Sequence, residues 1–247
     1  MANTHSNISF ALVDIPIIMN PIIKNNDTSF NQIHKKCGKR ISYVKYCPTC
    51  KKQVKDSEIL KGYQYEQNHY VIFEKEELNR LKPENEHEIE IISFVNLKEI
   101  DPYYFEKSYV LTSTGKARSY SLFYQALKKT GLVALCKTSM NQKFYYGILR
   151  LQKEYMILTT LYFEEEINLP ESNQKKEVNE KELNLAVQLI ESLKGKFEPE
   201  KYIDEYQNQI KQAIESKVEG KEVKQTKRKK NKHIDDLMEA LEKSLKK

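Results

Sequence analysis

Three apolar runs between residues 132 and 163 constrain the fold of this chain more than any other feature. They read LVALCKT (132–138), KFYYGILRL (143–151) and EYMILTTLYF (154–163), and they are rich in β-branched and aromatic residues. The polar pairs Asn141-Gln142 and Gln152-Lys153 separate them. Short runs of this composition at this spacing predict consecutive β-strands of a sandwich or a barrel.

Further strands and one helix are predicted upstream of these runs. The segment ISFALVDIPII (8–18) predicts a buried strand closed by Pro16. Other strands are predicted at residues 70–73, 88–95 and 109–112. Residues 119–130 predict a helix that ends before Gly131. One helix among so many strands makes the body mainly β, in the α+β class.

The composition changes at Pro170, after which a polar linker leads into predicted helices. Asn179 and Glu182 form a candidate capping box for a helix that stops at Gly195. A second helix is predicted from Pro199 to Gly220. A basic spacer then precedes a terminal helix with Ile234, Leu237, Met238, Leu241 and Leu245 on one stripe. These apolar stripes must pack on the β body, on each other or on a partner.

The charge of the chain is concentrated in two basic blocks. The net charge is +6, but residues 34–62 alone carry +7 and residues 220–247 carry +5, which leaves −6 for the remainder. A chain with an acidic body and two basic blocks is suited to meet a polyanion at defined places. Basic runs can also be solvated faces or tails that bind nothing. This alternative has more weight for the second block alone than for the two blocks taken together.

Four residues of the first basic block have the spacing of zinc ligands. His34 and Cys37 form one pair, Cys47 and Cys50 form the other, and each pair has two residues between its members. Two such pairs can place four ligands around a structural zinc ion. The alternatives are unligated thiols beside a surface histidine, or a Cys47–Cys50 disulfide, which a reducing cytoplasm disfavours. Cys136 lies in an apolar run and is predicted to be a buried hydrophobic residue.

The basic side chains around these pairs are the candidate nucleic-acid contacts. Because lysine predominates, we expect contacts to phosphates, without sequence preference and with strong salt dependence. Tyr43, Tyr46, Tyr63 and Tyr65 could stack on bases, but tyrosines in a strand-rich region are more often core or rim residues. The candidate DNA contacts are Lys35, Lys36, Lys39, Arg40, Lys45, Lys51, Lys52, Lys61, Lys116 and Arg118.

No motif in the sequence indicates catalysis. Thr114-Gly115-Lys116-Ala117 resembles the end of a phosphate-binding loop but lacks its first glycine and its Ser/Thr. HExxH and G-x-S-x-G motifs are absent from the sequence. From the missing motifs we expect a protein that is not an enzyme. The sequence also has no run of 18 apolar residues and no basic, cleavable leader, so we expect it to be cytoplasmic, without a membrane partner.

Several long segments together resemble the bacterial Ku proteins across nearly the whole chain. They are ISFALVDIPI (8–17), FNQIHKKCGKRISYVKYCPTC (30–50), ILKGYQYEQNHYVIFEKEEL (59–78), IEIISFVNLKEIDPYYFEKSYVL (89–111), SLFYQALKKTGLVALCKTSMNQKFYYGILRL (121–151), ELNLAVQLIESLKGKFEPEKYIDEYQNQIKQAIESK (182–217) and DLMEALEKSLKK (236–247). The chain departs from the family in having no tryptophan-containing lead-in before the first strand. Some relatives lack the cysteines, so the zinc prediction rests on spacing alone.

The resemblance implies a fold, partners and a domain plan. It implies a Ku-type β-barrel over residues 1–169 with an inserted bridge at about 30–70, and a homodimeric ring threaded by double-stranded DNA. It also implies that a helical C-terminal domain, residues 170–220, contacts the ATP-dependent DNA ligase D in non-homologous end joining, and that the protein is nucleoid-associated. Residues 221–247 would form the basic spacer and the last helix.

A different class of protein also fits the residues. A zinc-ribbon accessory protein of transcription or RNA metabolism would carry the same basic, cysteine-bearing loop. It would be monomeric, whereas an end-binding ring requires two copies, so the oligomeric state separates the two interpretations.

Overall fold

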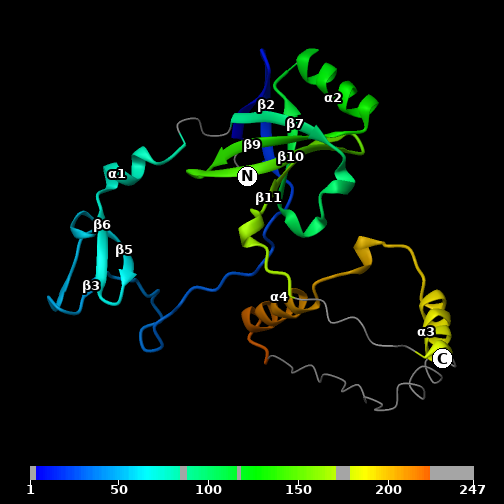
Figure 1. Cartoon of the computed structure of the whole chain (residues 1–247). Coiled ribbons are helices and arrows are strands. Elements are labelled where there is room, and N and C mark those ends of the chain that lie inside the picture. Colours follow the sequence, from blue (N-terminus) through cyan, green and yellow to red (C-terminus); the bar gives the residue numbers. More distant parts are fainter. Residues whose placement is uncertain (1–3, 84–87, 116–117, 171–178, 223–247) are drawn as a thin grey trace. The chain divides into compact units, whose positions relative to one another are not determined.

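The computed structural model describes residues 4–83, 88–115, 118–170 and 179–222 (Figure 1). The chain divides into two compact units. One comprises residues 1–25 and 32–169, and the other comprises residues 26–31 and 170–247. The short segment 26–31 thus belongs with the C-terminal unit, where the Thr28 backbone N–H donates a hydrogen bond of 3.1 Å to Gln207 Oε1.

The first unit contains a closed barrel of seven strands, which confirms the prediction of a mainly β fold. In their order around the barrel the strands are β1 (Thr4–Phe10), β2 (Val13–Pro21), β8 (Phe105–Ser113), β11 (Tyr155–Leu161), β10 (Lys143–Gln152), β9 (Val133–Met140) and β7 (Glu88–Val95). Neighbouring strands are antiparallel except β1 and β7, whose parallel pairing closes the barrel. Closure leaves no free sheet edge, so every strand has two hydrogen-bonded neighbours.

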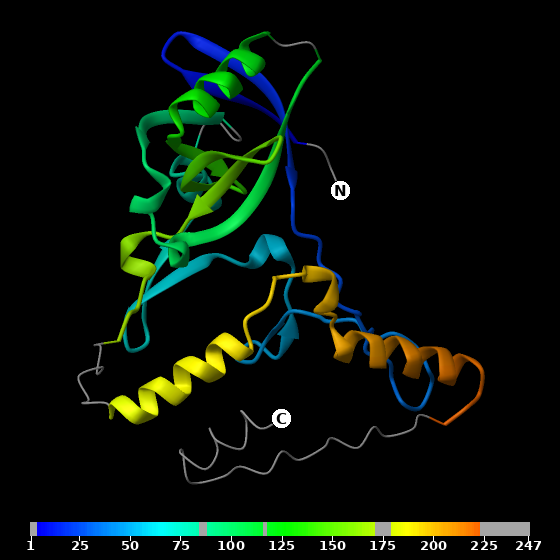
Figure 2. The ribbon, with the colours of Figure 1, turned by 90° about the vertical axis from the view of Figure 1, so that its right-hand side faces the viewer.

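Side chains from the strands and from helix α2 fill one core. Alternate residues of the strands point inward, among them Ile8 and Ile15, which are partners in the β1–β2 register. Helix α2 (Arg118–Thr130) packs against β2 and β10 and contributes Phe123 and Leu127 to the same cluster (Figures 1 and 2). Cys136 is also part of this core, as predicted, and its thiol donates to the Gly147 carbonyl at 3.2 Å.

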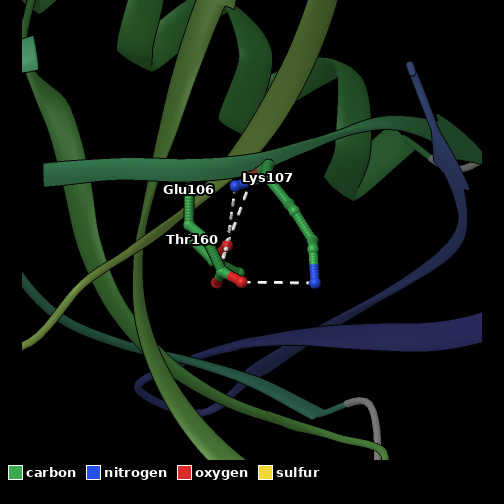
Figure 3. A network of polar contacts seen from close by, with 3 residues as sticks. All are labelled: Glu106, Lys107 and Thr160. Carbon is green, nitrogen blue, oxygen red and sulfur yellow. Dashed lines mark hydrogen bonds and ion pairs between the residues drawn. The ribbon is translucent and has the colours of Figure 1, made fainter. Parts of the chain in front are cut away.

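Polar side chains join β8 to β11 where the register shifts between Thr159 and Leu161. The Thr160 hydroxyl is buried; it accepts a hydrogen bond from the Lys107 backbone N–H and lies 3.1 Å from Glu106 Oε2 (Figure 3). Glu106 also pairs with Lys107 Nζ at 3.2 Å. Ser108 and Thr159 form a further contact of 3.0 Å between their hydroxyls. The polar groups at this irregularity are therefore paired with each other.

Between β2 and β7 the chain leaves the barrel, and residues 22–25 and 32–83, which belong to the first unit, form what we call the bridge. Its elements are short: β3 (Tyr46–Cys47), β4 (Lys52–Gln53), β5 (Lys61–Glu66), β6 (His69–Phe73) and helix α1 (Lys75–Arg80). The strands pair only as two antiparallel hairpins, β3–β4 and β5–β6. A 3₁₀ turn, Asp56–Glu58, lies between them. The bridge contains no buried residue.

The C-terminal unit contains helices α3 (Glu180–Ser192) and α4 (Glu205–Val218). Asn179 caps α3 by accepting a hydrogen bond from the Lys181 backbone N–H at 2.9 Å. Asp204 caps α4 by accepting from the Gln207 N–H at 2.9 Å. The described residues of this unit include no buried side chain. No helix in the described ranges is long and apolar enough to cross a membrane.

Two details of the predicted first strand were wrong. Residues 8–18 are parts of two strands, because Ala11 takes a positive φ of 53° and turns the chain back on itself before Val13. Pro16 does not end a strand but lies inside β2, opposite Asn7.

The ends of the C-terminal helices also differ from the prediction. Helix α3 ends at Ser192 rather than Gly195. Pro199 opens only a 3₁₀ turn, and α4 begins six residues later because Asp204 supplies its cap. The predicted terminal helix lies outside the described residues.

Further 3₁₀ turns lie between β7 and β8 and after β11. They are Leu97–Glu99, Pro102–Tyr104 and Glu164–Glu166. The acidic cluster Glu164–Glu166 therefore forms an exposed turn, in which the Phe163 N–H donates to Glu166 Oε2.

Candidate nucleic-acid interface

The first half of the basic segment is a tight loop closed by backbone hydrogen bonds. Gly38 N–H donates to the His34 carbonyl at 2.9 Å, and His34 N–H donates to the Lys39 carbonyl at 2.8 Å. Gly38 has a φ of 68°, a conformation that glycine adopts without steric cost. Ile33 and Arg40 form a β-bridge below the turn. The loop therefore displays basic residues along both arms of one turn.

The second half is the β3–β4 hairpin. Cys47 pairs with Lys52, and the Pro48-Thr49-Cys50-Lys51 stretch between them makes the turn. Lys51 has a φ of 51°. Below the hairpin, the Val54 N–H donates to the Lys45 carbonyl at 3.0 Å. Backbone hydrogen bonds rather than a core thus fix the positions of the lysines in this half.

The ten candidate DNA contacts fall into three groups. Lys45 is paired with Asp56 at 2.6 Å, and Lys52 with Glu58 at 3.7 Å. Within the described part of the chain, six others have no ion-pair partner, namely Lys35, Lys36, Lys39, Arg40, Lys51 and Lys61, and all are exposed. Arg118 is exposed but belongs to the first turn of α2 on the barrel, and Lys116 lies outside the described residues. The six unpaired residues are the best candidates for phosphate contacts.

Each predicted pair of metal ligands is formed on one turn. His34 Nδ1 lies 3.1 Å from Cys37 Sγ, and the Cys50 N–H donates to Cys47 Sγ at 3.5 Å. The backbone hydrogen bond from Cys50 lowers the pKa of Cys47, whereas the side-chain hydrogen bond with Cys47 raises the pKa of Cys50. Among the described residues, no three His, Cys, Asp or Glu side chains are grouped closely enough to hold a metal ion. The structure therefore brings together the pairs but not the tetrad.

Tyrosines and aliphatic residues of the bridge are exposed, which the sequence did not predict. Tyr43, Tyr63 and Tyr65 have exposed fractions of 80%, 66% and 55%. They are not core residues, although tyrosines near strands usually are. The exposed aliphatic side chains of the bridge include Ile33, Val44, Ile59, Leu60 and Ile72. The signal that could have revealed this surface is the shortness of the apolar runs between residues 22 and 83, none of which is long enough to build a core.

Comparison with known proteins gives a consistent result. Residues 9–185 match the family model described as the Ku70/Ku80 beta-barrel domain. The chain is 40% identical over 241 residues to the non-homologous end joining protein Ku of Desulfitobacterium hafniense, covering 96% of this chain and 85% of that protein. It is 37% identical over 249 residues to the protein of the same name from Lachnoclostridium phytofermentans, covering 100% and 97%. It is 35% identical over 246 residues to that of Bacillus subtilis, covering 96% and 79%.

Proposed function

Because the chain belongs to the Ku family of non-homologous end joining proteins, we propose that it binds the ends of linear double-stranded DNA as a homodimeric ring and recruits the ATP-dependent DNA ligase D. Membership confirms the resemblance seen in the sequence. The barrel, its basic bridge and the helical C-terminal unit are the parts from which the proposal is built. In this proposal the protein is a scaffold and not an enzyme.

The observation that carries the proposal is the set of six exposed, unpaired basic side chains on the bridge. Five of the six are lysines, which act on phosphates as point charges and do not read base edges. Since neither Asp56 nor Glu58 neutralises them, they remain available to displace counterions from a duplex. We therefore expect binding without sequence preference and with a steep salt dependence.

The bridge also supports the dimer in this proposal. It has no buried residue, yet it exposes Ile59, Leu60 and Ile72 together with several tyrosines. Segments that expose this much apolar surface are typical of interfaces rather than of free loops. A second copy paired through the bridge would cover these side chains and enclose the duplex.

The ligase would bind the C-terminal unit. Helix α3 exposes Leu183, Val187 and Ile190, which recur on one stripe of the helix. An amphipathic helix whose apolar stripe has no partner is suited to dock on another protein. Substitution of these three residues with Ser should abolish stimulation of the ligase while leaving DNA binding intact. Loss of both activities would argue against a separate ligase-binding element.

We propose a structural zinc ion for His34, Cys37, Cys47 and Cys50. The donor set suits zinc, and each pair already shares a turn, so zinc would only have to hold the two turns together. Metal analysis of protein purified without chelators should find one zinc per chain. Cys37→Ser and Cys47→Ser should lose it, whereas Cys136→Ser, a change in the barrel core, should keep it. Protein that contains no zinc would refute this part of the proposal.

The decisive experiment is a competition between linear and closed-circular DNA. A ring loads only from an end, so linear duplex should displace a labelled linear probe and closed circles of equal mass should compete poorly. Equal competition by the circles would overturn end binding. Light scattering on the same samples separates the ring from the zinc-ribbon alternative, because the ring requires a dimer and the ribbon would be a monomer.

Charge reversal tests the location of the DNA contact. Lys39→Glu with Arg40→Glu should weaken DNA binding and reduce the slope of log K against log salt by about 2, since each phosphate contact contributes about 0.9. Lys143→Glu with Lys153→Glu makes the same charge change at exposed barrel positions and serves as the control. Equal effects of the two pairs would show that only net charge matters.

A further inference from the structure

An apolar hollow of about 220 Å³ lies beside helix α2 on the outside of the barrel. Its lining includes Phe10 from β1, Phe94 from β7 and Phe123 from α2. The rings of Phe10 and Phe94 meet edge to face, with centroids 5.5 Å apart, and those of Phe10 and Phe123 are 6.0 Å apart. Phe10 and Phe94 remain 38% exposed, so this aromatic cluster is open to a ligand.

A second hollow of about 200 Å³ adjoins the first, because Leu127 and Leu132 line both. We call the two hollows together the α2 groove. Apolar residues line most of the second hollow as well, but Lys128 and Arg150 add positive charge. None of the lining residues of either hollow is acidic. The groove thus combines an apolar floor with basic side chains.

Arg150 supplies a guanidinium at the wall of the second hollow. Its Nε atom is buried and has no hydrogen-bond partner in the described structure, while one of its Nη atoms donates to Gln152 Oε1 at 3.2 Å. A guanidinium pairs with a carboxylate through charge-assisted hydrogen bonds. The occupant of the groove should therefore bring both apolar and acidic side chains.

One segment of this chain has that chemistry and lies outside the described residues. Residues 234–245 read IDDLMEALEKSL, with four acidic residues and one lysine. Their apolar members Ile234, Leu237, Met238 and Leu241 follow the i, i+3, i+4, i+7 spacing by which a helix fills a groove. Helix α3 is a poorer match, because its 13 residues carry three acidic residues and one lysine, a net charge of −2 against −3 for the shorter segment.

We propose that the α2 groove binds residues 234–245 of a second copy of this chain. The apolar stripe would cover Phe10, Phe94 and Leu132, and the acidic side chains would face Lys128 and Arg150. This inference rests on the proposed function in one respect, since the homodimer supplies the second copy.

Peptide binding tests the groove directly. The protein is the full-length chain with Leu237→Asp and Leu241→Asp, which disable its own segment, and the probe is a fluorescent peptide of residues 234–245. We expect saturable binding by fluorescence anisotropy, and no displacement by a peptide of residues 179–193 from helix α3. Absence of binding, or displacement by the α3 peptide, would overturn the proposal.

Two neighbouring positions of α2 provide a matched pair of variants. Ala126 lines the groove, whereas Gln125 does not, and both are exposed. Ala126→Glu places a carboxylate over the apolar floor and should weaken peptide binding by about tenfold or more. Gln125→Glu adds the same charge to the same helix and should change the affinity by less than about twofold. Equal effects would place the peptide elsewhere.

A charge swap tests the basic side of the groove. Lys128→Glu should weaken binding of the native peptide, and a peptide with Asp235→Lys and Asp236→Lys should bind this variant better than it binds the parent protein. If the peptide with Asp235→Lys and Asp236→Lys binds both proteins equally, Lys128 does not contact the peptide.

Mixing two variants tests whether the segment comes from the second copy. One variant carries Ala126→Glu with an intact segment and a dye at residue 247, and the other carries Leu237→Asp and Leu241→Asp with an intact groove. Neither can dock its own segment, so a rise in anisotropy on mixing requires docking between copies. No rise would overturn the assignment to a second copy. Because Ala126→Glu leaves the bridge unchanged, its linear-versus-circular competition reports on the proposed function independently.

Discussion

The barrel and the bridge are held in their conformations by different interactions. Every buried residue of the described chain lies in a barrel strand or in helix α2, and the bridge has none. The barrel strands hold each other by continuous hydrogen-bonded ladders around a core that includes Ile17, Leu149 and Leu158. The bridge relies on tight turns, two short hairpins and exposed ion pairs.

This difference indicates what each region depends on. Apolar burial is the main stabilising term for a domain, so the barrel can fold with its own residues alone. A segment of about sixty residues without a core cannot be stabilised in this way, and its conformation depends on outside contacts. The proposed partners of the bridge, namely a second copy, DNA and zinc, are contacts of that kind. The four predictions below test the contrast, from the largest expected effect to the smallest.

Truncation of a leucine should affect the two regions very differently. Leu158 is fully buried in β11, whereas Leu60 in the bridge is 52% exposed. Leu158→Ala should lower the free energy of unfolding by about 2–5 kcal/mol, because it leaves a cavity in the core. Leu60→Ala should change it by no more than about 0.5 kcal/mol, but it should weaken the proposed dimer. Urea denaturation and light scattering measure the two effects, and similar losses of stability would show that the bridge has a core after all.

Addition of a methyl group at a glycine makes a second comparison. A Cβ on Gly147 in β10 would lie 2.9 Å from Leu158 Cδ1 and 3.0 Å from the Thr159 carbonyl oxygen. Gly147→Ala should therefore cost about 1–3 kcal/mol in thermal or urea unfolding. Gly62 in β5 is the matched site, because its nearest contact would be Tyr70 Cδ1 at an ordinary 3.4 Å. If Gly147→Ala leaves the free energy of unfolding unchanged, the groups around the added Cβ can move aside without cost.

The same contrast determines how much of the molecule could be predicted from its sequence. Strand β7 was predicted at its observed bounds, and β9–β11 within a few residues, because each strand is a single apolar run. The β1–β2 hairpin was missed since its turn at Ala11 lies inside an apolar run. The α2 groove could not have been predicted, because Phe10, Phe94 and Leu132 come from three distant segments.

Prediction of the candidate interface was limited for a related reason. The spacing of the cysteines indicated the two turns, because a pair separated by two residues needs only local geometry. It could not indicate that Lys45 is neutralised by Asp56, which is eleven residues away. With no core to impose a pattern on the bridge, hydrophobic periodicity carries little information there.

Loss of a polar contact should again matter more in the barrel. Thr160→Val removes the hydroxyl that accepts from the Lys107 N–H and lies beside Glu106, so the partly buried N–H loses this acceptor and Glu106 keeps only its ion pair with Lys107. We expect a loss of about 1–2 kcal/mol. Asp56→Ala in the bridge breaks the Lys45 ion pair, whose side chains are 61% and 85% exposed. Asp56→Ala should lower the free energy of unfolding by less than about 1 kcal/mol. If it lowers stability more than Thr160→Val does, polar contacts do not matter more in the barrel than in the bridge.

The smallest effect should be a loss of stability at alkaline pH that originates in the barrel core. Burial raises the pKa of the Cys136 thiol from 9.0 to about 12. Above pH 9 the thiol of the unfolded chain releases its proton while the folded chain retains it, so the unfolded state binds fewer protons and stability falls as the pH rises. Burial also raises the pKa of Tyr109 and Tyr120, which adds to the loss in the same direction.

Urea titrations at several pH values separate the contribution of the thiol from that of the tyrosines. Between pH 8.5 and 10, Cys136→Ala should lose about 1 kcal/mol less stability than the parent, because its tyrosines titrate but it has no thiol. Val133→Ala in the same strand lowers stability without removing a titrating group, so its pH dependence should match that of the parent. If the unfolding free energies of Cys136→Ala and Val133→Ala change equally with pH, the core does not keep the thiol protonated. That result would contradict the burial of Cys136 in β9.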